Sequence, residues 1–112
     1  MAISNVEVVN TTSKYIVKST GTKSETNQEL VDAENLTEGT DGSKVSLIEC
    51  YYLIEGTGIL TISAGDETLP LDGKGKYGLR PGQLKFGNDK IFNLTTDSNV
   101  KSYLLVTEFR RN

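Results

Sequence analysis

The sequence predicts an all-β fold, a single antiparallel β-sandwich or jelly roll, and three observations support this. Short runs of Thr, Val, Ile, Leu, Tyr and Phe recur along the chain, and Gly, Asn, Asp and Ser interrupt them roughly every 8–12 residues. No convincing stripe of apolar residues has the period of a helix. The length of 112 residues suits one domain, which we assign to residues 1–112.

The first part of the chain predicts short strands separated by polar loops. Residues 5–9 fit either a short strand or part of an extended N-terminal arm that spans residues 1–12. Residues 14–19 alternate as a strand does. Residues 28–36 fit a helical turn or a short strand followed by a turn, and we favour the strand. Residues 20–43 as a whole form an acidic, loop-rich segment, with turn residues dense at its end.

Two longer strands, residues 45–54 and 100–109, are apolar on both faces. Such strands belong in the middle of a two-sided core or at a subunit interface, and we expect the two to lie side by side. Alternation in the first strand predicts one face with Val45, Leu47, Tyr51 and Leu53, and an opposite face with Ile48, Cys50, Tyr52 and Ile54. Glu49 is the exception on its face, and its carboxylate needs a partner or solvent.

Turn residues divide the remainder into further short strands. A glycine-rich hairpin turn is predicted at residues 55–58. The strands are predicted at residues 59–64, 68–71, 76–79, 84–86 and 91–96, and Pro70 weakens the pairing of the second of these. The turns between them are predicted at residues 65–67, 72–75, 80–83, 87–90 and 97–99, where Pro81 and Gly82 favour a type II turn.

Composition argues against an enzyme. The chain has no histidine, so it cannot form a Ser-His-Asp or Cys-His couple or an imidazole metal site. We therefore predict no catalytic residue, no metal ligand and no cofactor. The single Cys50 lies in an apolar run and is expected to be a buried thiol. An isoelectric point near 4.9 argues against nucleic acid as a partner, and no run is apolar and long enough for a membrane span.

Two local patterns resemble functional motifs but lack the required context. Gly73, Gly75 and Gly78 have the spacing of a dinucleotide-binding loop, yet a proline-glycine turn follows them where that motif needs a helix. Acidic residues at 66, 67 and 72 lack the spacing of a calcium-binding loop. We interpret both patterns as solvated turns.

Charge is distributed unevenly along the chain. Residues 1–43 carry seven acidic residues and three lysines, whereas residues 44–112 carry eight acidic and nine basic residues. A basic patch of Arg110 and Arg111 with Lys14, Lys18 and Lys101 is either solvated or a docking surface for an acidic partner. The candidate partner-contact residues are Ile3, Val6, Val8, Tyr15, Lys18, Arg110 and Arg111.

The rhythm of residues 45–109 resembles a cupin-type β-barrel. The similarity rests on Leu53-Ile54-Glu55-Gly56-Thr57-Gly58-Ile59-Leu60-Thr61-Ile62 and on Leu79-Arg80-Pro81-Gly82-Gln83. Cupin enzymes hold their metal with histidines, which this chain lacks. The resemblance therefore implies, as one alternative, a small-ligand-binding domain without metal, and more remotely a carboxylate-dependent lyase or isomerase. A ligand pocket would be lined by Tyr51, Tyr52, Tyr77 and Phe92.

A second resemblance covers most of the chain and gives our leading hypothesis. Segments such as Tyr15-Ile16-Val17-Lys18-Ser19 and Ser46-Leu47-Ile48-Glu49-Cys50-Tyr51-Tyr52 look like small β-proteins of marine tailed bacteriophages. Such proteins are usually virion accessory components, which implies a non-enzymatic capsid decoration or cement protein. The implied partners are the major capsid protein or another virion protein and further copies of the chain. The implied location is the virion, after synthesis in the host cytoplasm without a signal peptide.

Overall fold

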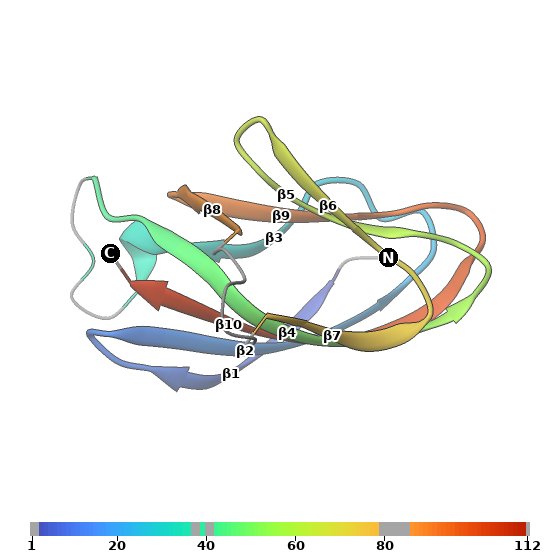
Figure 1. Cartoon of the computed structure of the whole chain (residues 1–112), viewed down its shortest axis with the longest axis horizontal. Helices are drawn as coiled ribbons and strands as arrows, with labels where there is room; N and C mark the ends of the chain where they lie inside the picture. The colour runs from blue at the N-terminus through green and yellow to red at the C-terminus, as the bar shows by residue number, and fades with distance from the viewer. Residues whose placement is uncertain (1–2, 37–38, 40–41, 79–85, 112) are drawn as a thin grey trace.

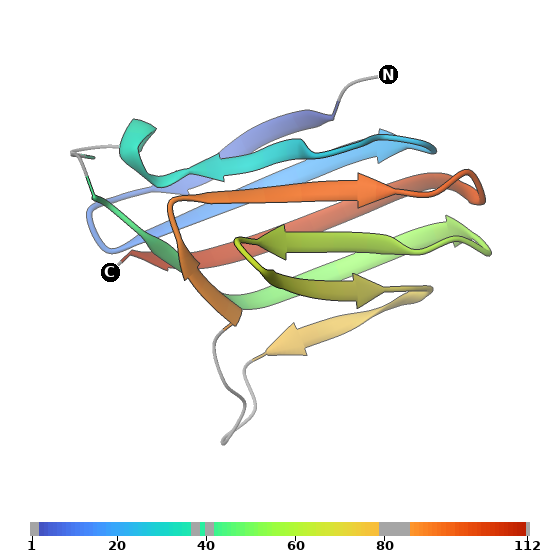
Figure 2. The same cartoon turned by 90° about the horizontal axis from the view of Figure 1, so that it is seen from above.

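The computed structural model describes residues 3–36, 39, 42–78 and 86–111, and these form a sandwich of two antiparallel sheets (Figures 1 and 2). The larger sheet has the order β1 (Ser4–Asn10), β2 (Lys14–Thr22), β10 (Val100–Arg111), β4 (Val45–Gly56) and β7 (Lys74–Gly78), with β8 (Phe86–Asp89) also paired to β4. The smaller sheet has the order β3 (Gln28–Asp32), β9 (Ile91–Thr96), β5 (Leu60–Ala64) and β6 (Glu67–Leu71). The predicted all-β, antiparallel fold class is confirmed.

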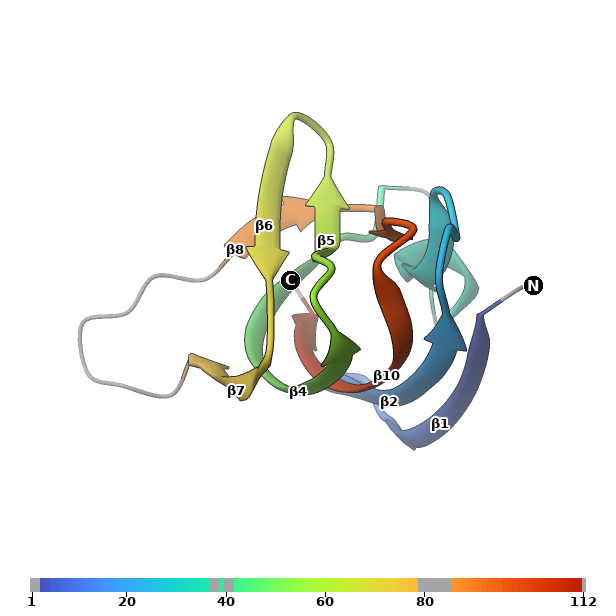
Figure 3. The ribbon, with the colours of Figure 1, turned by 90° about the vertical axis from the view of Figure 1, so that its right-hand side faces the viewer.

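The two long strands with two apolar faces lie side by side, as predicted. β10 pairs with β4 over almost its whole length and with β2 on its other side, so it occupies the middle of the larger sheet (Figure 3). Tyr103, Leu105 and Phe109 point into the sandwich and are buried, whereas Leu104 lies on the outer surface. Each of these strands therefore has one face in the core and one face on the surface.

A β-bulge corrects the predicted face assignment in β4. The register moves from Glu108 opposite Glu49 to Phe109 opposite Leu47, so Ile48 is an extra residue. Val45 and Leu47 are consequently in the core, while Tyr51 and Leu53 lie on the outer surface. Strict alternation had placed these four residues together, because a bulge cannot be read from a pattern of period two.

The predicted hairpin at residues 55–58 is wrong. β4 belongs to the larger sheet and β5 to the smaller one, so this segment carries the chain from one sheet to the other. Gly56 has a φ of 97°, and a side chain at Gly58 would collide with the carboxylate of Asp97. The backbone N–H of Ile59 donates a hydrogen bond of 3.0 Å to that carboxylate. The glycines thus permit a close crossing between sheets.

Several other strand boundaries differ from the predicted ones, because pairing with distant strands lengthens a strand beyond its local pattern. Residues 4–10 pair with β2 as an edge strand, so the segment is no free arm. β2 continues to Thr22 because its last residues pair with β10. The segment 28–36 forms β3 and a single 3-10 turn, η1 (Ala33–Asn35), as favoured. Residues 86–89 form a strand on β4, so the turn predicted to begin at residue 87 is wrong as far as residue 89. Predicted features at residues 37–38, 40–41 and 79–85 lie outside the described residues.

The core between the sheets is filled by large apolar side chains from both. Phe92 of β9 and Phe109 of β10 are fully buried and meet edge to face, with 4.9 Å between ring centroids. Tyr15 packs near Phe109 at 6.4 Å between centroids. Aromatic pairs in this geometry contribute roughly 0.5–1.5 kcal/mol beyond their buried area. This aromatic cluster joins the two sheets near the end of the sandwich where β2 and β9 begin and β10 ends.

Replacing Thr107 by valine is expected to stabilise the protein by about 1 kcal/mol. Thr107 is fully buried in the core, and its Oγ1 has no hydrogen-bond partner in the part of the chain that the structure describes. Valine has nearly the same shape, so the change removes an unsatisfied polar atom without opening a cavity. Urea denaturation of the two proteins measures the difference. A loss of stability would show that the hydroxyl has a partner in solution.

The stability of the protein is expected to fall as the pH rises above about 9. Burial raises the pKa of the Cys50 thiol from 9.0 to about 12, against a smaller lowering by the backbone N–H of Tyr77. Because folding raises the pKa of this thiol, its contribution to stability is complete as long as the thiol of the unfolded chain is still protonated. This contribution is complete below pH 9 and is lost between pH 9 and 12, at no more than about 1.4 kcal/mol per pH unit.

A Cys50→Val variant provides the control for this pH dependence. Its free energy of unfolding should decline less steeply than that of the parent protein over the same range. The remaining decline reports the buried tyrosines, since burial also raises the pKa of Tyr103 and Tyr15. Identical slopes for the two proteins would contradict a buried, protonated Cys50.

Candidate docking face

The outer surface of the larger sheet, here called the docking face, exposes large apolar side chains. Register and alternation place Val6 of β1, Tyr51 and Leu53 of β4, and Leu104 of β10 on this surface. Their exposed fractions are 58%, 49%, 44% and 36%, and they are four of the six large hydrophobic residues that are exposed in the described part of the chain. Contiguous apolar exposure of this kind marks interaction sites more often than scattered single residues do.

The outer surface of the smaller sheet provides an internal comparison. Its inward side carries buried residues such as Leu60, Ile62 and Leu94. Alternation therefore turns outward several small polar residues, Thr61, Ser63, Thr68, Asn93 and Thr95, together with Pro70, Ile91 and Glu29. The two outer surfaces of one sandwich thus differ, because the exposed side chains of Tyr51, Leu53 and Leu104 lie on the larger sheet.

Two shallow hollows form a groove across the docking face. One, of about 190 Å³, is lined by Tyr51, Tyr52, Leu53, Gly75, Leu104 and Val106. The other, of about 150 Å³, is lined by Ile16, Glu49, Tyr51, Val106 and Glu108. The hollows share Tyr51 and Val106, so they adjoin one another. The groove is apolar at one end and carries two carboxylates at the other.

The acidic end of the groove holds two carboxylates among several basic side chains. Glu49 and Glu108 are directly opposite each other on β4 and β10. Lys76 of β7 lies over the ring of Tyr51, with 5.2 Å from Nζ to the ring centroid, and 4.0 Å from a carboxylate oxygen of Glu49. Among the described residues, no cation lies within 4.0 Å of the Glu108 carboxylate. The predicted need of Glu49 for a partner is met by Lys76, at the outer limit of an ion pair.

The sequence-predicted contact residues divide between the docking face and other environments. Val6, Lys18 and Arg110 are exposed on strands of the larger sheet, and Val8 is exposed beside the irregular step in β1. Lys18 lies opposite Val106, and Lys14 opposite Arg110, so part of the predicted basic patch does gather on the docking face. Lys101 lies at the opposite end of β10.

Three of the predicted contact residues are not available on the surface as expected. Tyr15 is 6% exposed and packs in the core, which corrects its assignment as a surface contact. Ile3 is partly buried against the core. Arg111 donates a 2.6 Å hydrogen bond from Nη1 to the backbone oxygen of Thr11, so it anchors the β1–β2 turn. Alternation alone could not identify which apolar positions face inward.

The four aromatic residues expected around a ligand pocket do not converge. Tyr51 is on the docking face, whereas Phe92 is fully buried between the sheets. Tyr52 and Tyr77 are partly buried and pack against the core near the β7 edge. A single cavity lined by all four would have to cross the larger sheet.

A buried carboxylate lies at the end of the sandwich where the chain leaves β2 for the smaller sheet. Glu25 is 1% exposed and accepts hydrogen bonds from the Tyr103 hydroxyl at 2.6 Å and from the backbone N–H of Thr22 at 2.8 Å. Its own N–H donates to Oγ1 of Thr96. Burial and then the Glu25 hydrogen bond raise the pKa of Tyr103, which therefore stays protonated as a donor. These contacts hold the crossing segment, so we interpret this cluster as structural.

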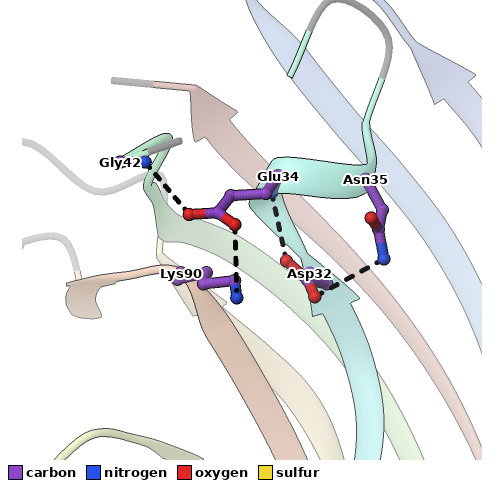
Figure 4. A network of polar contacts seen from close by, with 5 residues as sticks. All are labelled: Asp32, Glu34, Asn35, Gly42 and Lys90. Atoms are coloured by element: carbon purple, nitrogen blue, oxygen red, sulfur yellow. Dashed lines mark hydrogen bonds and ion pairs between the residues drawn. The ribbon is translucent and has the colours of Figure 1, made fainter. Parts of the chain in front are cut away.

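A second polar network closes the opposite end of the smaller sheet (Figure 4). Glu34 accepts a hydrogen bond of 3.0 Å from the backbone N–H of Gly42 and pairs with Lys90 at 3.3 Å. The Gly42 N–H, followed by Lys90, lowers the pKa of Glu34. Asp32 accepts from the backbone N–H of Glu34 and from the side chain of Asn35, which caps the 3-10 turn. This network joins three separate segments.

The motif-like patterns lie in ordinary strand and turn settings. Residues 74–78 form β7, so the glycine pattern is a strand next to a turn at Gly73. Asp66 and Asp72 flank opposite ends of β6. Within the described ranges no group of three or more acidic, cysteine or histidine residues is placed to hold a metal ion, and no helix is long and apolar enough to cross a membrane.

Comparisons with known proteins found a structural similarity. No family model and no curated protein matches the chain. A crystallised cupin domain from Bordetella pertussis Tohama I is similar over 99% of this chain and 94% of its own, with 10% sequence identity and a TM-score of 0.44.

Proposed function

We propose that this chain is a non-enzymatic protein-binding domain that docks through the outer face of its larger sheet. The observation that supports this most is the contrast between the two outer surfaces. Tyr51, Leu53 and Leu104 are exposed on the larger sheet, whereas the smaller sheet presents mainly threonine, serine and asparagine, with Pro70 and Ile91 as its apolar residues. Aromatic and aliphatic residues in a hollowed surface are the groups that contribute most to protein interfaces.

The finer proposal is that the docking partner is a viral shell. The resemblance to small virion proteins of tailed bacteriophages supports a role in decorating or stabilising the capsid, with further copies of the chain as neighbours. The filled core fits a domain whose outer surface, rather than its interior, does the binding. The docking face would then lie against the major capsid protein or another virion protein.

Co-sedimentation with purified heads of the bacteriophage that encodes the chain tests this role. A Leu53→Ser, Leu104→Ser variant is expected to lose at least about tenfold in affinity, since truncating buried apolar anchors costs roughly 1–2 kcal/mol each. A Thr61→Ala, Thr95→Ala variant of the other outer surface is the matched control and should bind as the parent does. Equal loss in both variants would contradict docking through the larger sheet.

The same experiment separates the two levels of the proposal. If the parent chain remains in the supernatant while the heads sediment, the virion role fails. Docking through the larger sheet fails independently if surface variants of β4 and β10 bind every identified partner as well as the parent does.

A further inference from the structure

We propose that the docking face binds an acidic segment of a partner protein, which places an apolar side chain in the hollow lined by Leu53 and Leu104 and carboxylates on Lys18 and Lys74. This inference rests on the proposed docking function and specifies the chemistry of the partner. It follows from the charges of the two sheets, from the rows of side chains across the larger sheet and from the hollow at its centre.

Basic side chains gather on the docking face. The four strands of the smaller sheet contain no lysine or arginine, and their charged residues are acidic. Register and alternation place three carboxylates on the docking face, those of Glu49, Glu55 and Glu108. They place five exposed basic side chains there: Lys14, Lys18, Lys74, Lys76 and Arg110. A chain with a formal net charge of −3 thus presents a basic surface on one side.

The carboxylates on this face are less accessible than the cations. Glu49 is 8% exposed and pairs with Lys76. Glu108 is partly buried, and Arg110 follows it on the same face of β10. Among the residues that the structure describes, no carboxylate lies within 4.0 Å of the ammonium of Lys18 or Lys74. These two lysines are therefore the cations that a partner would meet first.

Strand pairing places the lysines on both sides of an apolar strip. In two neighbouring rows across the sheet, an apolar pair from β10 and β4 lies between a residue of β2 and a lysine of β7. The rows are Lys18, Val106, Tyr51 and Lys76, and Thr20, Leu104, Leu53 and Lys74. Neighbouring strands are about 4.8 Å apart, so β2 and β7 are roughly 14 Å apart. The hollow of about 190 Å³ lies in the middle of this span.

These distances set the pattern of side chains in the partner segment. In an extended segment, side chains two positions apart point the same way and are about 7 Å apart. A segment that crosses the strands would place an apolar residue in the hollow and an acidic residue two positions to either side, over β2 and β7. The apolar side chain supplies buried area, and the two lysines select partners that carry the matching charge.

The carboxylates of the docking face favour a protein segment over a uniform polyanion. A phosphate backbone or an anionic lipid surface would set negative charge against Glu49 and Glu108 as well as against the lysines. The net charge of −3 would also repel a large polyanion at long range. A protein segment can confine its carboxylates to the lysine positions. Screening at physiological salt then limits the influence of charges more than about 8 Å away.

The same charges favour a different protein over a second copy of this chain. Two copies with stacked docking faces would bring the basic residues of both into one interface, and like charges across an interface repel. The formal net charge of −3 on each copy adds to this repulsion.

Amide NMR titration of the isotope-labelled chain with short synthetic peptides tests the proposal. The probe peptide carries leucine with a glutamate two positions to either side in a serine-threonine background, and two matched peptides carry glutamine or lysine in place of both glutamates. The glutamate peptide should shift the amides around Leu53, Leu104 and Lys74 and bind about fivefold more tightly than the glutamine peptide at low salt. This difference should shrink in about 0.5 M NaCl. The lysine peptide should bind more weakly than the glutamine peptide.

Variants of the two lysines make the test specific. Lys18→Met and Lys74→Met should each weaken binding of the glutamate peptide about twofold, and the double variant about fivefold, with no change for the glutamine peptide. Lys44→Met is the matched control, because it makes the same change in net charge at an exposed site just before β4, at the end away from Leu53. It should have a smaller effect than either single variant. Dispersed amide spectra verify that each variant is folded.

Four outcomes would overturn the inference. The first is no shift at millimolar peptide, and the second is equal binding of the glutamate and glutamine peptides. The third is tighter binding of a single-stranded oligonucleotide or of phosphatidylserine vesicles than of the glutamate peptide, which would make a polyanion the occupant. The fourth is a set of shifts at the same amides when the chain alone is concentrated, which would make a second copy the occupant.

Failure of this inference is distinguishable from failure of the proposed function. If Leu53→Ser, Leu104→Ser abolishes docking to an identified partner while Lys18→Met, Lys74→Met binds normally, the inference fails and the proposed function stands.

Discussion

A Phe92→Ala variant is expected to lose about 3–5 kcal/mol of stability, the largest effect of any single substitution considered for this chain. Phe92 is fully buried and packs edge to face on Phe109, so truncation removes an aromatic contact between the two sheets and leaves a cavity. Domains of this size have total stabilities of roughly 5–15 kcal/mol, so the variant will be close to unfolding. Urea denaturation followed by tyrosine fluorescence measures the loss.

Asn93→Ala is the matched control for this substitution. Asn93 lies next to Phe92 on the same strand, β9, but faces outward from the smaller sheet. Its replacement should change stability by no more than about 0.5 kcal/mol, as is usual for surface sites. If the two variants were destabilised equally, the packing of Phe92 on Phe109 would not hold the two sheets together.

Tyr103→Phe is expected to cost about 2–3 kcal/mol although it removes a single oxygen. The Tyr103 hydroxyl donates the 2.6 Å hydrogen bond to Glu25, which is 1% exposed. Without this donor, a buried carboxylate keeps one backbone N–H as its partner, and an incompletely paired buried charge is costly. The change should appear as a lower urea midpoint with an unchanged dependence on urea concentration.

A double-mutant cycle separates this hydrogen bond from general loss of packing. Glu25→Gln makes the side chain neutral, so the later loss of the Tyr103 hydroxyl should cost less than it does beside the carboxylate. We expect a coupling energy of about 1–2 kcal/mol between the two positions. Additive effects would mean that Glu25 and Tyr103 stabilise the fold independently.

Local patterns predicted most of the strands but not their partners. Residues 91–96 and 100–109 were predicted as strands, and both form strands. The turn at 55–58 was misread, because a glycine-rich turn looks the same whether the next strand returns to its own sheet or joins the other. The sequence also could not predict the acidic pair of the groove, because Glu49 and Glu108 meet only through the pairing of β4 with β10.

The candidate docking face had a partial signal in the sequence. Strands with apolar residues on both faces indicated either a two-sided core or an interface. The structure decides this by covering one face of β4 and β10 with the smaller sheet and leaving Tyr51, Leu53 and Leu104 exposed on the other. Nothing in the sequence predicted the contact of Lys76 with Tyr51, because it depends on the pairing of β7 with β4.

The sequence by itself determined the all-β class, the absence of histidine chemistry and the two central strands of the larger sheet. These follow from residue types and from alternation, which act over a few neighbouring positions. The tertiary structure alone decided the bulge at Ile48, the crossing at Gly58 and the buried pair of Glu25 and Tyr103, which are 78 residues apart. Such features arise because strand pairing and packing depend on both partners at once, and local alternation specifies only one.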